Sequence, residues 1–381
     1  MTLLYLTEDY LHSKVHNNLL MCMLEQDKNL KIYLFAPQRP RVGETLISGF
    51  IKHERLIEVI VPIDIPLSRY RFDFRAKVRC KVRLIEKFVP ISKIDVIHAA
   101  TLFTEGSVAR VIQKKYNIPF FVSMRGTDSD FYAQKMFHLW PMSRDVIKNA
   151  NAMAYVTPMI KRKMMERWQY RDFRDKLRMG FIINNGIDSI WINNQYLEKK
   201  TISDPVRVLY IGRFDSNKNV MRLITAVKEI HKSQAIRLIL IGGDGDKQSL
   251  IEREVKQHSD FIEYIGKIFD KQKLIQIVRE CDCFAMVSHS ETFGLVYVEC
   301  LSQGIPIIYT LRTGFDGMYS QGEIGYGVES HSVDSIKNGL LNVIEHYNEL
   351  KNSISVVDFK RFSWYEIAQS YINIYKSIQN V

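Results

Sequence analysis

The chain has 381 residues, of which 46% are hydrophobic and 25% are charged, and it carries a formal net charge of +11. This balance excludes the disordered and fibrous classes, and the length favours a globular protein of two domains. No apolar run approaches the ~18 residues of a membrane-spanning helix, and five scattered cysteines without Cys-x-x-Cys spacing argue against a disulfide framework or a zinc site, so we expect a cytoplasmic location.

Short apolar runs alternate with amphipathic stretches along the first half, which is typical of a parallel sheet covered by helices. The expected strands are Leu3–Leu6, Leu30–Phe35, Leu56–Val61, Val96–His98, Phe120–Ser123, Ala152–Val156 and Phe181–Ile183. Helical patterns include Ser13–Glu25, Gly106–Tyr116 and Met159–Trp168. A polar run near Ile190–Pro205 then indicates a linker between domains.

Two basic stretches in this half, residues 69–87 and 161–178, interleave cations with apolar residues. Residues 1–200 hold 33 Lys+Arg against 20 Asp+Glu, whereas the remainder holds 20 against 22. Such stretches are typical of solvated helices whose apolar side faces the core, and also of surfaces that contact anionic membranes. Both interpretations stay open, and nucleic acid is not expected because no nucleic-acid-binding motif accompanies the charge.

A second series of strands and helices begins at Val206. The expected strands are Val206–Ile211, Ile236–Ile241, Phe261–Ile265, Cys283–Val287 and Ile305–Tyr309, the last of which should close the sheet. The expected helices are Val220–Ile230, Lys247–Gln257, Lys271–Glu280 and Leu295–Gln303, and the apolar pattern Phe362–Ile378 predicts a docked terminal helix. We therefore expect an α/β protein with two Rossmann-like domains, residues 1–190 and 204–360, and a ligand crevice between them at the carboxyl ends of the strands.

Arg213 and Lys218 follow the first strand of the second series. Two cations on a loop that enters a helix suit a diphosphate, although the same pair would also fit an ordinary exposed surface. Glycines at 242, 243 and 245 follow the next strand and permit either a close ligand or a simple tight turn.

The most informative segment runs from Ser290 to Glu299. A turn leads into an apolar helix near Leu295, whose first N–H groups offer an anion site. Glu291 and Glu299 could both reach one ligand, where carboxylates would accept hydrogen bonds from sugar hydroxyls. The alternative is a helix cap plus a buried acid, but an unpaired Glu299 among apolar neighbours would be costly.

At these residues the chain resembles retaining glycosyltransferases of the GT-B fold, specifically glycosyltransferase family 4. The pattern of two glutamates eight positions apart is followed by the turn Ser302-Gln303-Gly304-Ile305-Pro306. Other landmarks of the family fall in order along nearly the whole chain. They are Asp95–His98, Arg125–Asp128, Asn184–Asp188, Gly212-Arg213 with Lys218, Gly242–Gly245, Tyr264–Gly266 and Arg361–Trp364.

The resemblance implies a role for each matching position. Arg213, Lys218 and Glu291 would be catalytic, the two cations holding the donor diphosphate and Glu291 lying near the transferred sugar. Glu299 would bind the ribose hydroxyls. The remaining donor-binding residues would be Gly212, Gly243, Lys267, Ile268, Thr292, Phe293, Gly294 and Leu295. The resemblance also implies a final helix, about residues 362–381, that crosses back to the first domain, a nucleotide-sugar substrate with UDP favoured, and no metal or other cofactor.

The departures from the family lie mainly on the acceptor side. The first loop reads Leu11-His12-Ser13-Lys14-Val15-His16, where the family usually has Gly-Gly. Arg125 stands where the family often has histidine. A second Gly-Gly pair of the family is reduced to one glycine in Arg312-Thr313-Gly314. Arg125 suggests an anionic acceptor or a salt bridge with Asp128. Expected acceptor-side residues are Ser13, His16, His98, Arg125 and Thr127.

We expect a glycan or lipid-linked acceptor, with possible contact with an anionic membrane, in the assembly of a bacterial surface polysaccharide or glycoconjugate. The alternatives are a nucleotide-sugar epimerase or phosphorylase on the same fold, and a catalytically silent binding module.

Overall fold

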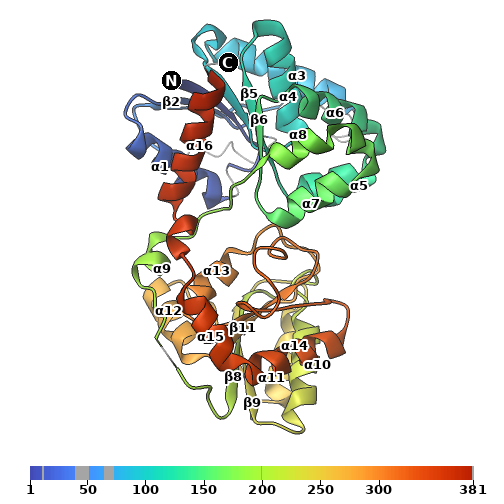
Figure 1. Cartoon of the computed structure of the whole chain (residues 1–381), viewed down its shortest axis with the longest axis vertical. Helices are drawn as coiled ribbons and strands as arrows, with labels where there is room; N and C mark the ends of the chain where they lie inside the picture. Colours follow the sequence, from blue (N-terminus) through green and yellow to red (C-terminus); the bar gives the residue numbers. More distant parts are fainter. Residues whose placement is uncertain (11–12, 39–50, 64–72, 199, 380–381) are drawn as a thin grey trace. The chain divides into compact units, whose positions relative to one another are not determined.

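A computed structural model of the chain describes residues 1–10, 13–38, 51–63, 73–198 and 200–379. The chain forms two compact units, one made of Met1–Gly186 with Trp364–Val381 and the other of Ile187–Ser363 (Figure 1). Each unit contains one parallel sheet flanked by helices, so the predicted α/β class with two Rossmann-like sheets is confirmed.

The first unit contains a seven-stranded sheet in the order β3-β2-β1-β4-β5-β6-β7. Its strands are β1 (Thr2–Leu6), β2 (Lys31–Phe35), β3 (Leu56–Val59), β4 (Val96–Ala99), β5 (Phe120–Met124), β6 (Ala152–Tyr155) and β7 (Phe181–Ile182). Each predicted strand of this half is present, because apolar runs buried on both faces are easily recognised. The strand order reverses between β1 and β4, which is where open α/β sheets offer a crevice.

Helices flank this sheet, and several of them have side-chain caps. They are α1 (Lys14–Gln26), α3 (Phe74–Phe88), α4 (Thr104–Tyr116), α5 (Ala133–Lys135), α6 (Trp140–Asn149), α7 (Pro158–Glu166), α8 (Arg174–Met179) and α16 (Trp364–Gln379). Ser13 caps α1 by accepting from the Val15 amide at 3.3 Å, Asp73 caps α3 through Ala76, and Thr157 caps α7 through Ile160.

The terminal helix α16 packs beside α1 and completes the core of the first unit, as predicted (Figure 1). Ile367, Tyr371 and Tyr375 are buried in the same cluster as residues of β1 and α1. The chain enters this helix through a close contact, because a Cβ on Gly186 would lie 2.5 Å from the Trp364 ring. A glycine is therefore needed where the first unit's two chain segments meet.

The second unit contains a six-stranded sheet in the order β10-β9-β8-β11-β12-β13. Its strands are β8 (Val206–Arg213), β9 (Ile236–Gly243), β10 (Ile262–Gly266), β11 (Cys283–Ala285), β12 (Ile307–Thr310) and β13 (Gly325–Val328). The prediction that the strand at Ile305–Tyr309 closes this sheet is wrong, since β13 pairs beyond it. Two glycines in β13 hide it from a propensity argument, yet Gly325 is required because its Cβ would lie 1.9 Å from the Ile307 carbonyl oxygen.

The helices of this unit are α9 (Ser189–Asn193), α10 (Val220–His231), α11 (Gln248–Gln257), α12 (Lys271–Glu280), α13 (Leu295–Leu301), α14 (Val333–Glu345) and α15 (Tyr347–Ser355). The polar segment 190–205 lies wholly within this unit, where Trp191 is buried. Across the described ranges, no helix is both long enough and apolar enough to cross a bilayer.

Candidate functional site

The carboxyl ends of the second unit's strands bring most of the predicted donor residues to one edge of the sheet. Gly212 and Arg213 end β8, Gly243 ends β9, Lys267 follows β10, and Glu291 lies in the segment after β11. Because β8, β9, β10 and β11 run parallel, their carboxyl ends lie at the same edge. The residues that sequence patterns singled out therefore share one region of this unit.

Lys218 and Glu291 form the central contact of this region. The Lys218 ammonium lies 2.6 Å from the Glu291 carboxylate, with side-chain exposures of 21% and 17%. The Lys218 backbone N–H donates to Asp215 Oδ1 at 2.9 Å, which fixes the loop that carries it. A cation held this way is positioned before any ligand arrives.

Arg213 presents its charge differently. Its side chain is 69% exposed, its Nε donates to the Asp244 carbonyl oxygen at 3.0 Å, and the Asp215 carboxylate lies 3.6 Å away. The guanidinium is thus tethered at one nitrogen and open to solvent. Of the two predicted cations, Lys218 is fixed by an ion pair and Arg213 is the accessible one.

The turn that carries Glu291 depends on two glycines. Gly294 precedes α13 with φ +79°, and a Cβ there would lie 2.5 Å from the Tyr297 ring. Gly314 packs against the turn, since its N–H donates to the Glu291 carbonyl oxygen at 2.8 Å and its Cβ would lie 2.0 Å from the Thr292 carbonyl oxygen. The turn at residues 312–314, which departs from the family pattern, therefore supports the predicted site.

The other predicted donor residues of this turn differ in how far their side chains are buried. Phe293 is buried, with its ring 6.1 Å from that of Phe315, so its side chain belongs to the core. Thr292 and Leu295 are half-buried. α13 ends at Leu301, two residues before its predicted end, because the chain turns through Gly304 at φ +75°.

Glu299 is a half-buried carboxylate on α13. Its side chain makes no hydrogen bond or ion pair with any residue in the described ranges. Burial raises its pKa to about 7, attraction to Lys271 opposes the rise, and repulsion from Asp188 adds to it. Lys271 is itself ion-paired with Asp188, so it only partly compensates the Glu299 charge. This carboxylate is available to accept hydrogen bonds from a ligand.

The glycine loop after β9 brings β8 and β9 together. Gly242 and Gly243 have φ values of +133° and +140°, and a Cβ on Gly242 would lie 1.8 Å from the Gly212 carbonyl oxygen. The Lys267 ammonium forms an ion pair with Asp244 in this loop. These glycines are thus needed because the backbones of the two strand ends are in direct contact.

Two of the predicted donor-binding residues, Lys267 and Ile268, are followed by an exposed aromatic residue that the sequence analysis did not name. Ile268 is half-buried, whereas the next residue, Phe269, is 88% exposed. An aromatic residue directly after Gly266-Lys267-Ile268 is the signal that could have identified it.

His16 and His98 lie in the core of the first unit, each 1% exposed. His16 Nδ1 is 2.8 Å from the Tyr5 hydroxyl and its Nε2 is 3.3 Å from Thr7 Oγ1. His98 bonds the Tyr375 hydroxyl at 2.5 Å and Ser123 Oγ at 2.9 Å. Burial, assisted by the charge of Arg125, holds the pKa of both imidazoles well below the ordinary value. Both rings are therefore neutral and have both nitrogens engaged within the unit.

Arg125 is half-buried, and its Nε donates to the Ala100 carbonyl oxygen at 3.0 Å. Asp128 accepts from the Arg125 backbone N–H at 2.9 Å, but no side-chain ion pair between them is found among the described residues. Asp128 also accepts from the Leu102 amide, and burial raises its pKa to about 7. Thr127 is exposed and Ser13 is the α1 cap, while Leu11 and His12 lie outside the described residues.

The basic stretch 69–87 is divided between core and surface by α3. Lys77 and Lys81 are buried and form ion pairs with Glu8, and Lys81 also reaches Glu105 at 3.3 Å. Although burial raises the pKa of Glu8, Lys81 and Lys77 outweigh it and lower that pKa to about 2. These two cations are internal, so not all basic residues of this stretch lie on the solvated side of α3.

The remaining cations of this helix, Arg75, Arg79, Arg83 and Lys87, are exposed and make no ion pair with any part of the chain that the structure describes. In the second stretch, Trp168 is 66% exposed. Lys163 pairs with Asp130 at 2.6 Å, and Lys161 donates to the Gly180 carbonyl oxygen. Residues 69–72 lie outside the described ranges. Within those ranges no cluster of His, Cys, Asp and Glu could hold a metal ion.

Comparison with known proteins relates this geometry to an enzyme class. Residues 193–355 match the family model of the glycosyl transferases group 1. An uncharacterized glycosyltransferase of Methanocaldococcus jannaschii is 26% identical over 292 residues, which cover 75% of this chain and 76% of the relative.

Two solved structures show the fold. The apo form of the lipopolysaccharide outer core galactosyltransferase WaaB matches with a TM-score of 0.71 and 15% identity over 99% of both chains. Anabaena HepE in complex with UDP matches with a TM-score of 0.66 and 16% identity, covering 99% of this chain and 100% of that one. The chain therefore has the fold of GT-B glycosyltransferases, as predicted. The family match and the Methanocaldococcus relative support a glycosyltransferase, and the matched segment lies within the second unit.

Proposed function

We propose that the chain transfers a hexose-type sugar from a nucleoside diphosphate donor, with UDP favoured, to an acceptor hydroxyl with retention of configuration, as in glycosyltransferase family 4. The observation that carries this proposal is one sheet edge holding the fixed Lys218–Glu291 pair and the accessible Arg213, with the unpartnered Glu299 on the helix α13 that follows Glu291. All four residues lie within the matched segment 193–355. The UDP named for the HepE complex supports the choice of nucleotide.

In the proposed reaction the bond from the anomeric carbon to the diphosphate oxygen breaks and a bond to the acceptor oxygen forms. The acceptor proton passes to the departing phosphate. Arg213 and Lys218 neutralise the charge that develops on the leaving group, and backbone N–H groups at residues 292–295 assist. Glu299 accepts hydrogen bonds from the ribose hydroxyls. We propose no metal or other cofactor. The sequence contains Asp128-Ser129-Asp130 and Asp244-Gly245-Asp246, but within the described ranges neither belongs to a group of His, Cys, Asp and Glu that could hold a metal ion.

The Lys218→Gln variant tests this assignment directly. Loss of one preorganised electrostatic donor lowers turnover by roughly a hundred- to a thousand-fold. Turnover is measured over a panel of UDP-sugars with an alcohol acceptor, and Lys256→Gln is the matched control because Lys256 is exposed on α11 without an ion pair in the described chain. Equal turnover in wild type and Lys218→Gln would remove Lys218 from the mechanism.

Two other activities are distinguished by simpler incubations. An epimerase converts the donor without any acceptor, and a phosphorylase consumes the donor with phosphate alone. A silent binding module binds the donor but releases no nucleotide. None of these three alternatives is favoured, because every protein compared above whose name states an activity is a glycosyltransferase.

We further propose a glycan or lipid-linked acceptor, used at the inner face of the cell membrane in surface polysaccharide or glycoconjugate assembly. The name of WaaB supports this class of product. The exposed cations of α3 and the exposed Trp168 support contact with an anionic bilayer, to which each basic residue contributes about 1 kcal/mol.

A further inference from the structure

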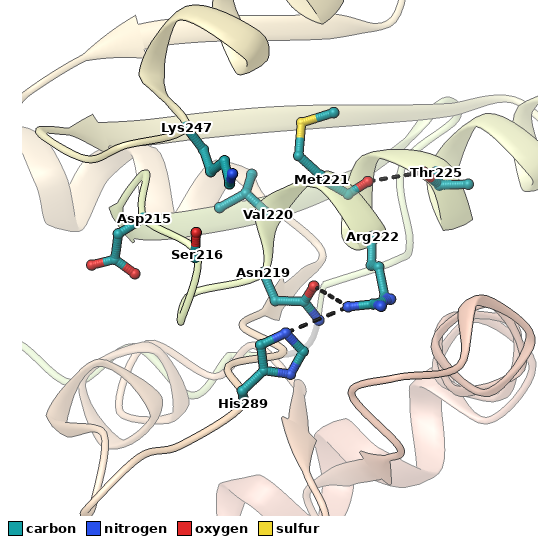
Figure 2. Close-up of a pocket in the computed structure, with 9 residues that line it drawn as sticks. All are labelled: Asp215, Ser216, Asn219, Val220, Met221, Arg222, Thr225, Lys247 and His289. Atoms are coloured by element: carbon teal, nitrogen blue, oxygen red, sulfur yellow. Dashed lines mark hydrogen bonds between the residues drawn. The ribbon is translucent and has the colours of Figure 1, made fainter.

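A cavity lies beside the loop that carries Lys218. This cavity, of about 320 Å³, opens at the start of α10 (Figure 2). Its polar lining consists chiefly of Asp215, Ser216, Asn219, Arg222, Lys247 and His289. The lining contains none of Arg213, Lys218, Glu291 and Glu299, so the cavity is distinct from the predicted donor residues.

Arg222 is held in this cavity by neutral partners. A terminal nitrogen donates to Asn219 Oδ1 at 3.0 Å and lies 3.4 Å from His289 Nε2 (Figure 2). Burial lowers the pKa of His289, and the nearby His331 and Arg222 lower it further, so the imidazole is neutral and accepts from the guanidinium. No carboxylate within the described chain pairs with Arg222. Its positive charge is fixed in place and remains uncompensated.

Lys247 supplies a second cation to the same cavity. Its ammonium is 3.5 Å from Asp246, whose carboxylate is already engaged by the Ser216 hydroxyl at 2.5 Å and by the Ser216 N–H at 2.8 Å. The one acid in the lining, Asp215, accepts from the Lys218 N–H and lies 3.6 Å from Arg213. The positive charges of Arg222 and Lys247 are thus less fully compensated than the negative charge of Asp215.

The backbone adds to this preference for anions. Asn219 has φ +56°, and its acceptor Oδ1 is engaged by the Arg222 guanidinium, so its side chain provides no cap for α10. Val220 and Met221, the first residues of this twelve-residue helix, line the cavity. The positive end of the helix therefore acts together with the two side-chain cations.

We infer that this cavity binds the phosphate group of a small molecule, either inorganic phosphate or a phosphate ester. A guanidinium and an ammonium beside an open helix start suit a compact dianion, and the volume lies near the lower limit of small-molecule pockets. The site is joined to the donor loop, because the His289 N–H donates to the Asn217 carbonyl oxygen at 2.8 Å, next to Lys218. The inference extends the proposed function but does not require sugar transfer.

Calorimetric titration of the full chain tests the site, with inorganic phosphate, glucose 6-phosphate and glucose as probes and with UDP present to occupy the donor residues. Arg222→Gln and Lys247→Gln should each weaken binding of both phosphate probes by about tenfold or more, because each removes a charge-assisted contact. Lys256→Gln, on the helix α11 that follows Lys247 but outside the lining, and Lys218→Gln should stay within about twofold. Glucose should not bind.

The outcomes separate this site from the donor site. Tighter binding of glucose 6-phosphate than of inorganic phosphate identifies an ester as the ligand, and equal binding identifies phosphate itself. Undiminished affinity in both Arg222→Gln and Lys247→Gln, or loss confined to Lys218→Gln, would overturn the inference. Because Lys247 is a surface side chain, its variant tests binding even where Arg222→Gln fails to fold. Absence of sugar transfer would refute the proposed function and leave this result unaffected.

Discussion

Replacing Glu299 by glutamine should stabilise the protein at alkaline pH while weakening its binding of a nucleotide-sugar. The folded-state pKa of this carboxyl is about 7, against an ordinary value of 4.5. Between these pH values the folded state binds more protons than the unfolded state, so this group makes stability fall as pH rises from 4.5 through 7. The full difference corresponds to about 3 kcal/mol, and solvent access to the half-buried group reduces it to about 1–3 kcal/mol.

Glutamine keeps the shape of the side chain and removes the charge. The gain in unfolding free energy should therefore stay below about 1 kcal/mol at pH 5 and should reach about 1–3 kcal/mol at pH 8. Urea unfolding of protein labelled with 5-fluorotryptophan measures it, because Trp191 is the one of the four tryptophans in the second unit and its ¹⁹F signal follows that unit alone. Affinity for UDP-sugars should fall because the acceptor of the ribose hydroxyls is weakened.

Glu263→Gln serves as the matched control, since Glu263 is exposed on β10 and makes no ion pair within the described ranges. The difference in unfolding free energy between Glu263→Gln and wild type should not increase from pH 5 to pH 8. An equal gain for Glu299→Gln at pH 5 and pH 8 would refute the electrostatic explanation. Unchanged donor affinity would remove Glu299 from the donor site.

Three further changes test separate parts of the structure. Gly314→Ala should lower turnover and cost about 1–3 kcal/mol in urea unfolding, because the new methyl would displace the Glu291 turn; wild-type values for both would contradict the contact. Lys81→Met should cost about 3–5 kcal/mol by leaving Glu105 unpaired, and a loss below about 1 kcal/mol would show that the pair is dispensable. Trp168→Ala should weaken sedimentation with anionic vesicles but not with neutral ones, and unaltered sedimentation would exclude Trp168 from membrane contact.

The periodic apolar pattern was sufficient to predict most of the sheets, because a parallel strand covered on both faces reads as an apolar run. It missed β13, because this strand contains glycines, which have a low propensity for strands. Gly325 is present because the backbone of Ile307 lies too close for a side chain. The pattern also missed that Lys77 and Lys81 point inward, since their partner Glu8 lies about 70 positions earlier in the chain.

The donor residues were predictable from their positions after strands, and the structure places Lys218 against Glu291. The setting of His98 was not predictable, because its ring bonds Tyr375, 277 positions away. Nothing local in the sequence around Asn219 signalled the phosphate cavity either, since its lining comes from three segments brought together by folding.

The return of α16 to the first unit has a consequence for synthesis of the chain on the ribosome. Tyr371 and Tyr375 fill the first unit's core, and they are translated after every residue of Ile187–Ser363. The second unit is continuous in sequence and can fold as soon as it has emerged. The unit that is translated first must wait with an open apolar surface, so during translation it is the part that depends on chaperone protection.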